Sequence, residues 1–205
     1  VCSSDLFGFN TFLKPDYSGY DSKFMKNDIL HSNSLHLNLI HQSIGLQRNR
    51  NNFGLVTGIG VLFQDYRLDD TITIVRTENA QIMPKSFHYS ENQKSKLFLY
   101  SVTVPVLAEI QIPVNNYRNR FYFSSGMYFT YRIGSYTNIK YKVEHNQKLK
   151  INDNYSLMNF RYGIMARTGY QWINFFAMYE LTPFFQQEKG PNLTPFIFGI
   201  TLLQF

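Results

Sequence analysis

The sequence predicts an all-β protein: an eight-stranded antiparallel up-and-down transmembrane β-barrel, with residues 1–205 as a single domain. Three observations predict it: segments in which apolar and polar residues alternate, connections that alternate between long and short, and the composition. Charged residues make up 17% of the chain, against about 25% in a typical soluble protein. Aromatic residues also make up 17%, and no stretch approaches the roughly 18 apolar residues that a spanning helix needs. Because an aromatic-rich soluble β protein can share this composition, the strand pattern has to decide.

The clearest strand covers residues 99–114. Its even-numbered residues from Val102 to Ile112 are all apolar, whereas Thr103, Glu109 and Gln111 lie on the other face. Successive side chains of a strand point to opposite faces. One face of this strand therefore suits hydrocarbon, and the other carries a carboxylate and an amide.

Seven further segments repeat this unit. The predicted strands are residues 6–13, 35–46, 53–66, 121–136, 160–170, 173–185 and 194–205. In the second of them the alternation slips near residues 41–43, which predicts a β-bulge. In the third, Gly54, Gly58 and Gly60 share one face, which suits the crowded interior of a narrow barrel.

The connections between these segments alternate in length. The long ones are residues 14–33, 67–96, 137–156 and 186–193, and the short ones are residues 47–52, 115–120 and 171–172. Short periplasmic turns at one rim and long extracellular loops at the other are typical of outer-membrane barrels. We therefore expect the protein in the bacterial outer membrane.

Several segments also resemble a known family. LYSVTVPVLAEIQIP (residues 99–113) resembles the central strand of the PorT-like outer-membrane β-barrel domains of Bacteroidetes, and FRYGIMARTGY (160–170), YELTPFF (179–185) and PFIFGITLLQF (195–205) resemble the segments that follow it. GLVTGIGVLFQDYRL (54–68) fits the glycine-rich third strand. The resemblance covers residues 35–205 and, more weakly, the first strand. It implies an outer-membrane barrel with both termini in the periplasm, and little about activity.

Five charged residues fall on the inward face of the predicted strands: Glu109, Arg132, Arg161, Arg167 and Glu180. An isolated charge in a dry lumen costs several kcal/mol, so these residues are expected to pair. Glu109 is expected to reach an inward arginine, which is Arg132 on the next strand or Arg161 or Arg167 on the strand after it. Eight strands leave room for little besides side chains, so a closed, salt-bridged lumen is expected, with a proton or ion path as the alternative.

The net charge of +6 comes mostly from the connections. Lys142, Lys148 and Lys150 are candidates to contact lipopolysaccharide phosphates, although a merely solvated loop explains them too. No nucleic-acid-binding motif accompanies them, so no nucleic-acid partner is expected. The expected partners are outer-membrane lipid and lipopolysaccharide, with other outer-membrane proteins as further candidates.

No catalytic, metal or cofactor site is predicted. His36 and His41 are the closest approach to a metal-ligand pair, but their spacing places them on opposite faces of a regular strand. His41 with Ser43 resembles the His–Ser pair of an outer-membrane phospholipase, yet no residue that would orient the histidine is identifiable. Cys2 is the only cysteine, so no internal disulfide is possible; VCSSD is open to reading as a lipid-modified N-terminus or as an expression remnant.

We therefore expect a non-enzymatic barrel that serves as a structural or accessory subunit of an outer-membrane assembly. The alternatives are a lipid-modifying barrel enzyme and a lipocalin-type ligand-binding barrel. The latter needs a roomy apolar interior, whereas the inner face here is rich in Gly, Arg and Glu. The sequence identifies no protein partner, ligand or biological process.

The alternating faces generate a first prediction. The protein should fractionate with outer membranes, and in gel electrophoresis with sodium dodecyl sulfate the unheated protein should migrate faster than the boiled one, because a barrel stays compact until it is heated. Recovery of folded protein in the soluble fraction without detergent would contradict this expectation.

Overall fold

The computed structural model describes residues 4–20, 23–25, 28–46, 52–87, 93–114, 119–142, 146–170 and 173–204. Within these residues the chain forms β1 (Ser4–Asp16), η1 (Ile29–His31), β2 (Asn33–Gly45), β3 (Phe53–Arg67), β4 (Ile72–Arg76), β5 (Ile82–Ser86), β6 (Lys94–Val114), β7 (Asn119–Lys142), β8 (Asn146–Asn152), β9 (Phe160–Tyr170), β10 (Ile173–Glu180) and β11 (Asn192–Gln204). The described part of the chain contains no helix that is long and apolar enough to cross a membrane.

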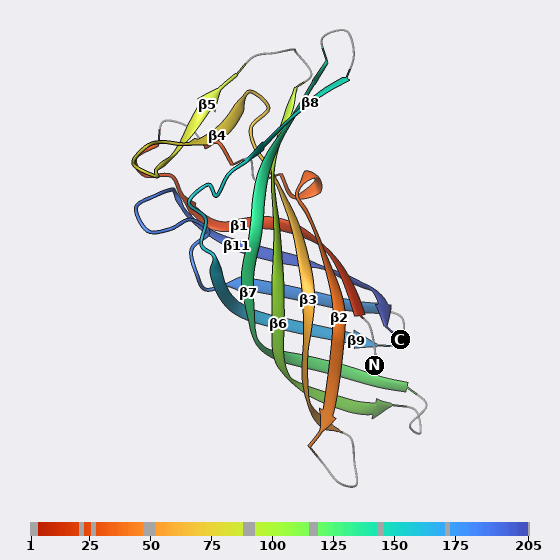
Figure 1. Ribbon diagram of the computed structural model, residues 1–205. Helices are drawn as coiled ribbons and strands as arrows, with labels where there is room; N and C mark the ends of the chain where they lie inside the picture. The colour runs from red at the N-terminus through yellow and green to blue at the C-terminus, as the bar shows by residue number, and fades with distance from the viewer. Residues whose placement is uncertain are drawn as a thin grey trace.

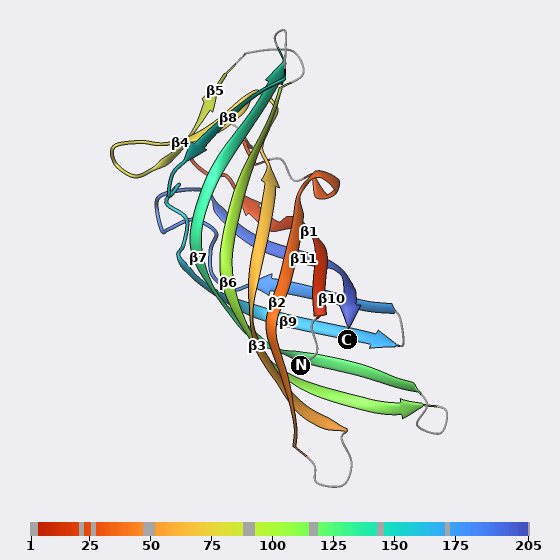
Figure 2. The same cartoon turned by 45° about the vertical axis from the view of Figure 1, so that its right-hand side comes forward.

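Eight of the described strands form a closed barrel. The hydrogen-bonded order is β6-β3-β2-β1-β11-β10-β9-β7, and β6 pairs with β7 to complete the ring (Figures 1 and 2). Each neighbouring pair is antiparallel, including β1 with β11 at the two ends of the chain. The eight predicted strands are therefore confirmed, and the ring has no free edge.

The two rims of the barrel differ. The start of β1, the end of β11 and the strand ends that flank the short connections lie at one end, whereas β4, β5 and β8 extend from the other end (Figure 1). The predicted sorting of connections by length is thus confirmed. The first of these ends is the periplasmic rim, and the end with the long connections is the extracellular rim.

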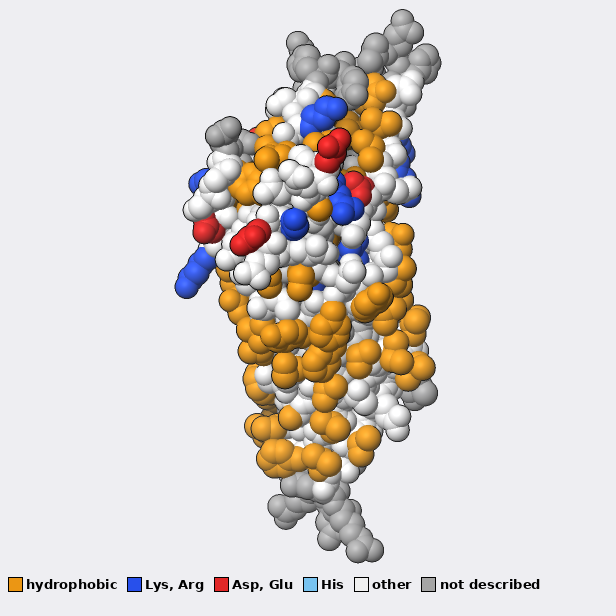
Figure 3. Space-filling view, turned by 60° about the vertical axis from the view of Figure 1, so that its left-hand side comes forward, with side chains coloured by type: hydrophobic (Ala, Val, Ile, Leu, Met, Phe, Trp, Pro, Cys, Tyr) orange, Lys and Arg blue, Asp and Glu red, His pale blue; other side chains and the backbone are white. Residues whose placement is uncertain are grey.

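Burial follows the predicted alternation along the strands. On β6, Val106 and Ile110 are exposed on the outer wall, while Thr103 and Leu107 are fully buried inside. The outer wall carries a band of hydrophobic side chains, and charged side chains gather beyond it toward the extracellular rim (Figure 3). This distribution matches a lipid-facing wall below a solvated rim.

The structure departs from the sequence prediction in three places. The bulge in β2 lies between Asn38 and Ile40, slightly before the predicted slip, and it leaves both Leu39 and Ile40 on the outside. The predicted strand 173–185 ends at Glu180, because Pro183 cannot donate to a neighbouring strand. A second register shift, between Tyr100 and Ser101 of β6, leaves Ile133 of β7 without an opposite residue and reverses the alternation beyond it, so that Ser135 faces inward.

The long connections also contain strands that the sequence did not predict. β7 continues past the barrel wall to Lys142 and pairs with β8, so part of the predicted polar loop is a sheet extension. β4 and β5 form a separate two-stranded sheet within the connection between β3 and β6. The extracellular mouth is therefore built largely from hydrogen-bonded strands.

Close packing of neighbouring strands generates the second prediction. A Cβ added at Gly126 of β7 would collide with the carbonyl oxygen of Val106 and lie 2.8 Å from the Cα of Leu107. Gly126→Ala should therefore lower the free energy of unfolding by about 1–3 kcal/mol, measured by urea titration in detergent micelles. Ser125→Ala, on the outer face of the same strand, is the control and should cost less; equal costs would contradict the close contact.

Candidate functional site

A buried ion pair lies inside the lumen, at the extracellular ends of β9 and β10. Nη1 of Arg161 on β9 lies 2.9 Å from Oε1 of Glu180 on β10 and donates to Oε2 at 3.0 Å. Nη2 donates to the side-chain oxygen of Gln64 on β3 at 2.9 Å, and Gln64 donates to the Tyr66 hydroxyl at 2.9 Å. Arg161 and Glu180 are only 1% and 0% exposed, so the pair and its partners link three strands across a dry interior.

Two apolar clusters fill the lumen on either side of this pair. The cluster on the barrel walls consists of Leu6, Val56, Leu62, Leu107, Tyr128, Met165, Phe176, Met178 and Ile197. The cluster toward the mouth consists of Phe12, Phe24, Met25, Tyr66, Leu68, Ile74, Ile82, Leu97, Leu99, Tyr155, Leu157, Phe184, Phe185 and Leu193. Large side chains thus occupy the interior along its length, as expected for eight strands.

The second cluster belongs to a group of interlocked long connections, which we call the loop plug (residues 17–20, 23–25, 68–87, 153–159 and 181–191). The backbone N–H of Ile82 donates to Lys189 O at 2.7 Å, and that of Gln186 donates to Ser156 O at 2.8 Å. The Ser156 hydroxyl donates to Ala80 O at 2.5 Å. Three of the long connections therefore hold one another directly over the mouth.

The first long connection joins the second through a backbone hydrogen bond from the N–H of Asp69 to Phe24 O at 3.0 Å, and aromatic packing holds the first connection itself together. The rings of Tyr17 and Phe24 meet edge to face at 5.7 Å, and the Tyr17 hydroxyl donates to Met25 O at 3.1 Å. Burial raises the pKa of Tyr17 to about 12. Sequence reasoning missed the plug; the available signal was the placement of Phe24 and Tyr155 in otherwise polar connections and of Phe184 directly after Pro183.

Arg132 fastens the loop plug to the wall. From β7 its guanidinium donates to Ser135 Oγ at 2.9 Å, to Asn159 Oδ1 at 2.5 Å and also to Asn154 Oδ1. The side chain is 7% exposed. Its partners are neutral amides and a hydroxyl, so this charge acts as a multiple hydrogen-bond donor that holds residues 153–159 inside the mouth.

The expected pairing of Glu109 with Arg132 is wrong. Glu109 lies opposite Ser124, whereas Arg132 lies opposite Ser101, eight positions farther along β6. At about 3.4 Å per residue these positions are roughly 27 Å apart along the strand. Both side chains face inward, but the register of the β6–β7 pair places them at opposite ends of the lumen.

Glu109 instead lies at the periplasmic mouth, where its carboxylate accepts a hydrogen bond from Gln111 at 2.6 Å. Together with Ser43, Gly54 and Arg120 these residues line a small cavity of about 150 Å³. Arg167 shares a row of the sheet with Glu109, because Ser124 on β7 lies opposite both. Two strand spacings separate the two backbones, about 10 Å.

The histidines that the structure describes do not form a metal centre. His36 is buried inside the barrel at 1% exposure, on the inner face of β2, as predicted. Among the described residues, no cluster of three or more His, Cys, Asp or Glu side chains could hold a metal ion. Cys2 lies outside the described residues.

Two of the three predicted lipopolysaccharide-contacting lysines lie on β8. Lys148 and Lys150 are exposed, and Nζ of Lys150 lies 4.0 Å from the centre of the Tyr136 ring. Lys142 ends β7, and its side chain lies outside what the structure describes. The basic residues therefore lie on a sheet extension at the extracellular rim.

Comparison with known proteins identifies the family. The model of the outer membrane protein beta-barrel domain family matches residues 7–186. The chain belongs to this family. Its location is accordingly the bacterial outer membrane, in agreement with the closed ring and the apolar outer wall described above.

The similarity of this outer-membrane barrel to individual known proteins is low. No curated protein matches the chain. Among solved structures it is similar to Ail, the attachment invasion locus protein of Yersinia pestis, with 15% identity over 100% of this chain and 98% of that chain and a TM-score of 0.33. A likeness with so low a score carries no argument about this chain.

The buried ion pair generates the third prediction. Glu180→Ala leaves the Arg161 guanidinium buried without its counter-charge, which should cost about 3–5 kcal/mol of unfolding free energy. Glu109→Ala removes a partly solvated carboxylate at the rim and should cost less than about 1 kcal/mol. Urea unfolding in detergent micelles measures both.

The double variant Arg161→Met/Glu180→Leu controls for the loss of packing, since it removes both charges and keeps most of the volume. It should be more stable than Glu180→Ala alone. A Glu109→Ala cost equal to that of Glu180→Ala would show that the two carboxylates are equally buried, contrary to the structure.

Proposed function

We propose that this protein is a non-enzymatic structural or accessory subunit of an outer-membrane assembly, of the PorT-like type found in Bacteroidetes. The filled lumen is the observation that carries the proposal. Arg161, Glu180 and the two apolar clusters occupy the interior, and a barrel filled in this way offers neither a solute path nor room for a ligand. In this proposal the outer surface of the molecule therefore carries the function.

The loop plug provides the contact surface in this proposal. Its connections are tied to one another and to the wall through Ser156, Arg132 and the backbone of Ile82. A surface held in one conformation loses little entropy on binding, which favours a role as a docking platform for other outer-membrane proteins. Outer-membrane lipid is the expected partner of the apolar wall.

The interior also argues for this role over the two alternatives. A lipocalin-type barrel needs an apolar ligand cavity, and here Tyr128, Phe176 and Met178 fill that space. A lipid-modifying enzyme needs a nucleophile with an oriented base. Ser43 lines the small polar cavity at the periplasmic mouth with Glu109 and Arg120. That cavity lies at the opposite end of the barrel from the long connections, which form the contact surface proposed here.

Electrical recording tests the closed lumen, our fourth prediction. Purified protein in a planar bilayer should show no sustained conductance of porin size. Removal of the plug anchor by Arg132→Ala should add at most brief openings, because the wall cluster stays in place. A steady, large conductance from the unchanged monomer would overturn the filled interior.

Native purification and an activity assay test the accessory role itself. Affinity purification from native outer membranes, after cross-linking, should recover defined outer-membrane proteins. Substitutions on the exposed surface of the loop plug, such as Arg76→Glu, should reduce their recovery more than changes in the periplasmic turns do. Release of fatty acids from phospholipid by the pure barrel, abolished by Ser43→Ala, would instead establish the enzyme alternative.

A further inference from the structure

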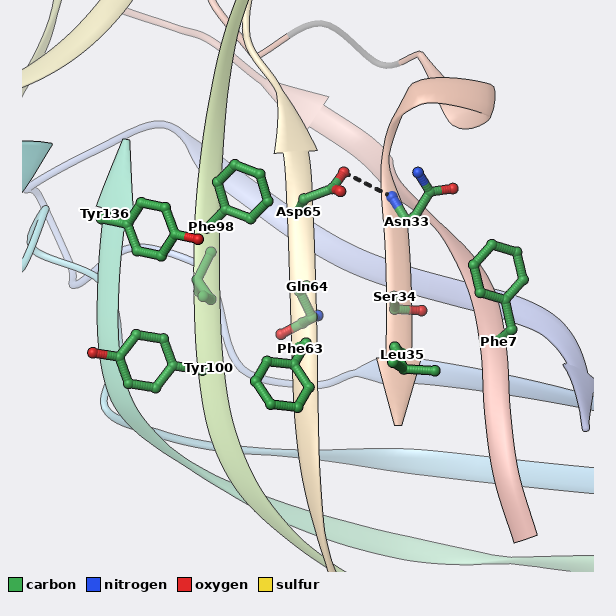
Figure 4. Close-up of a pocket in the computed structure, with 11 residues that line it drawn as sticks. Phe7, Asn33, Ser34, Leu35, Phe63, Gln64, Asp65, Phe98, Tyr100 and Tyr136 are labelled. Atoms are coloured by element: carbon green, nitrogen blue, oxygen red, sulfur yellow. Dashed lines mark hydrogen bonds between the residues drawn. The ribbon is translucent and has the colours of Figure 1, made fainter. Parts of the chain in front are cut away.

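A groove crosses the outer wall of the barrel just below the extracellular rim. It has a volume of about 260 Å³ and runs over β1, β2, β3, β6 and β7. Its lining is largely apolar and aromatic, and its walls are formed by the outward residues of the strands, such as Phe63, Tyr100 and Tyr136 (Figure 4), whereas Ser34, Gln64 and Leu99, which also line it, have buried side chains. The residues that line it are Phe7, Asn33, Ser34, Leu35, Phe63, Gln64, Asp65, Phe98, Leu99, Tyr100 and Tyr136.

The strand register explains the shape of this groove. The lower wall is one row of the sheet, since Phe7 lies opposite Leu35, Leu35 opposite Phe63, and Phe63 opposite Tyr100. The upper wall is the next outward row, in which Phe98 stacks on Tyr136 with ring centres 5.0 Å apart. Outward rows are two residues, or about 7 Å, apart, which leaves a channel as wide as a hydrocarbon chain.

Lysines occupy the next two outward rows above the groove. Lys96 of β6, Asn138 of β7 and Lys150 of β8 form the first row. Lys94, Lys140 and Lys148 form the second row, each directly opposite the next. The five lysines therefore lie on one face of the β6–β7–β8 sheet, about 7 and 14 Å above the aromatic row.

The charge of these rows is unbalanced within the described part of the chain. Asp65, which lines the groove, pairs with Lys96 at 3.1 Å and accepts from the backbone N–H of Asn33 at 3.0 Å. Lys94, Lys140 and Lys148 lie side by side across two strand pairs, and like charges directly opposite each other destabilise a sheet. An anion bound on this face would offset that repulsion.

We propose that this groove and the lysine rows above it form a binding site for a phosphorylated, acylated glycolipid of the outer leaflet, the chemical class of lipopolysaccharide. An acyl chain lies in the groove between the rings of Phe63, Tyr100 and Tyr136. The phosphate groups lie on the lysines, chiefly Lys140, Lys148 and Lys150. The site is on the outer wall, so it goes beyond the accessory role and does not depend on it.

The position of the site relative to the membrane supports this occupant. On β7 the outward residues from Phe121 to Tyr136 are mostly apolar, with Ser125 among them, and they become polar from Asn138 onward. The groove therefore lies where the hydrocarbon ends, and the lysines lie at headgroup height on the extracellular side. Nζ of Lys150, 4.0 Å from the ring centre of Tyr136, joins the two parts of the site.

Binding to the purified barrel tests the headgroup half of this proposal. The unchanged protein in phosphatidylcholine nanodiscs is titrated with a rough lipopolysaccharide, with its dephosphorylated form and with phosphatidylglycerol, and native mass spectrometry counts the bound molecules. We expect one tightly bound lipopolysaccharide per barrel and at least tenfold weaker binding of the other two lipids. Equal binding of phosphatidylglycerol would overturn the proposal, since any anionic lipid would then suffice.

Two triple Lys→Gln variants, which lose the same charge at different positions, test where the phosphate groups bind. Lys140→Gln/Lys148→Gln/Lys150→Gln should weaken lipopolysaccharide binding at least tenfold. The control Lys14→Gln/Lys23→Gln/Lys85→Gln loses the same charge from other connections and should change binding less than twofold. Heat-dependent gel migration verifies that both variants are folded. Equal affinities of the two variants would overturn the assignment of the phosphate site.

A second matched pair tests the groove. Leu35→Trp places an indole in the groove and should weaken binding several-fold, because it displaces the acyl chain. Leu37→Trp, the next outward residue on β2 and outside the groove, should bind as the unchanged protein does. Indistinguishable affinities of these two variants would overturn the acyl-chain site. The closed lumen is measured separately by conductance, so failure here leaves the proposed function standing.

Discussion

Backbone hydrogen bonding in a medium without water is the constraint on which the whole molecule depends. Hydrocarbon offers no partner for a peptide N–H or C=O, so each strand of the wall has to pair on both sides. The pairing of β6 with β7 meets this demand, because it joins the two ends of an otherwise open sheet. With the ring closed, the side-chain alternation of each strand divides the chain into a lipid-facing wall and a lumen.

The closed ring in turn determines what the interior has to contain. Eight strands enclose too little space for water to solvate a charge, so the inward charges need partners from the protein. Arg161 finds Glu180 and Gln64, and Arg132 finds the amides of the third long connection. Arg161 thus links strands to one another, and Arg132 links the third long connection to the strands.

The wall could be predicted from the sequence because its signal is local. The alternation of apolar and polar residues in 99–114 indicates which face of that strand meets lipid. The alternation of long and short connections predicts the up-and-down topology. The position of Glu109 follows from the short turn between β6 and β7, which the sequence analysis did not apply to single residues. Because Val114 lies opposite Asn119, Glu109 lies opposite Ser124 and far from Arg132, and the shift near Tyr100 lies beyond both positions. The loop plug was missed for a different reason: Phe24, Tyr155 and Phe184 come together only after the barrel has formed.

The interlocking of the long connections has a consequence for how the protein is seen from outside the cell. Ala80, Ser156 and Lys189 belong to three different connections, yet each is hydrogen-bonded to another of them or to their neighbours. An antibody or a phage that reads this surface would meet a discontinuous epitope assembled from distant parts of the chain. Short peptides copied from a single connection would not reproduce it, and sequence drift in one connection would alter the shape presented by the others.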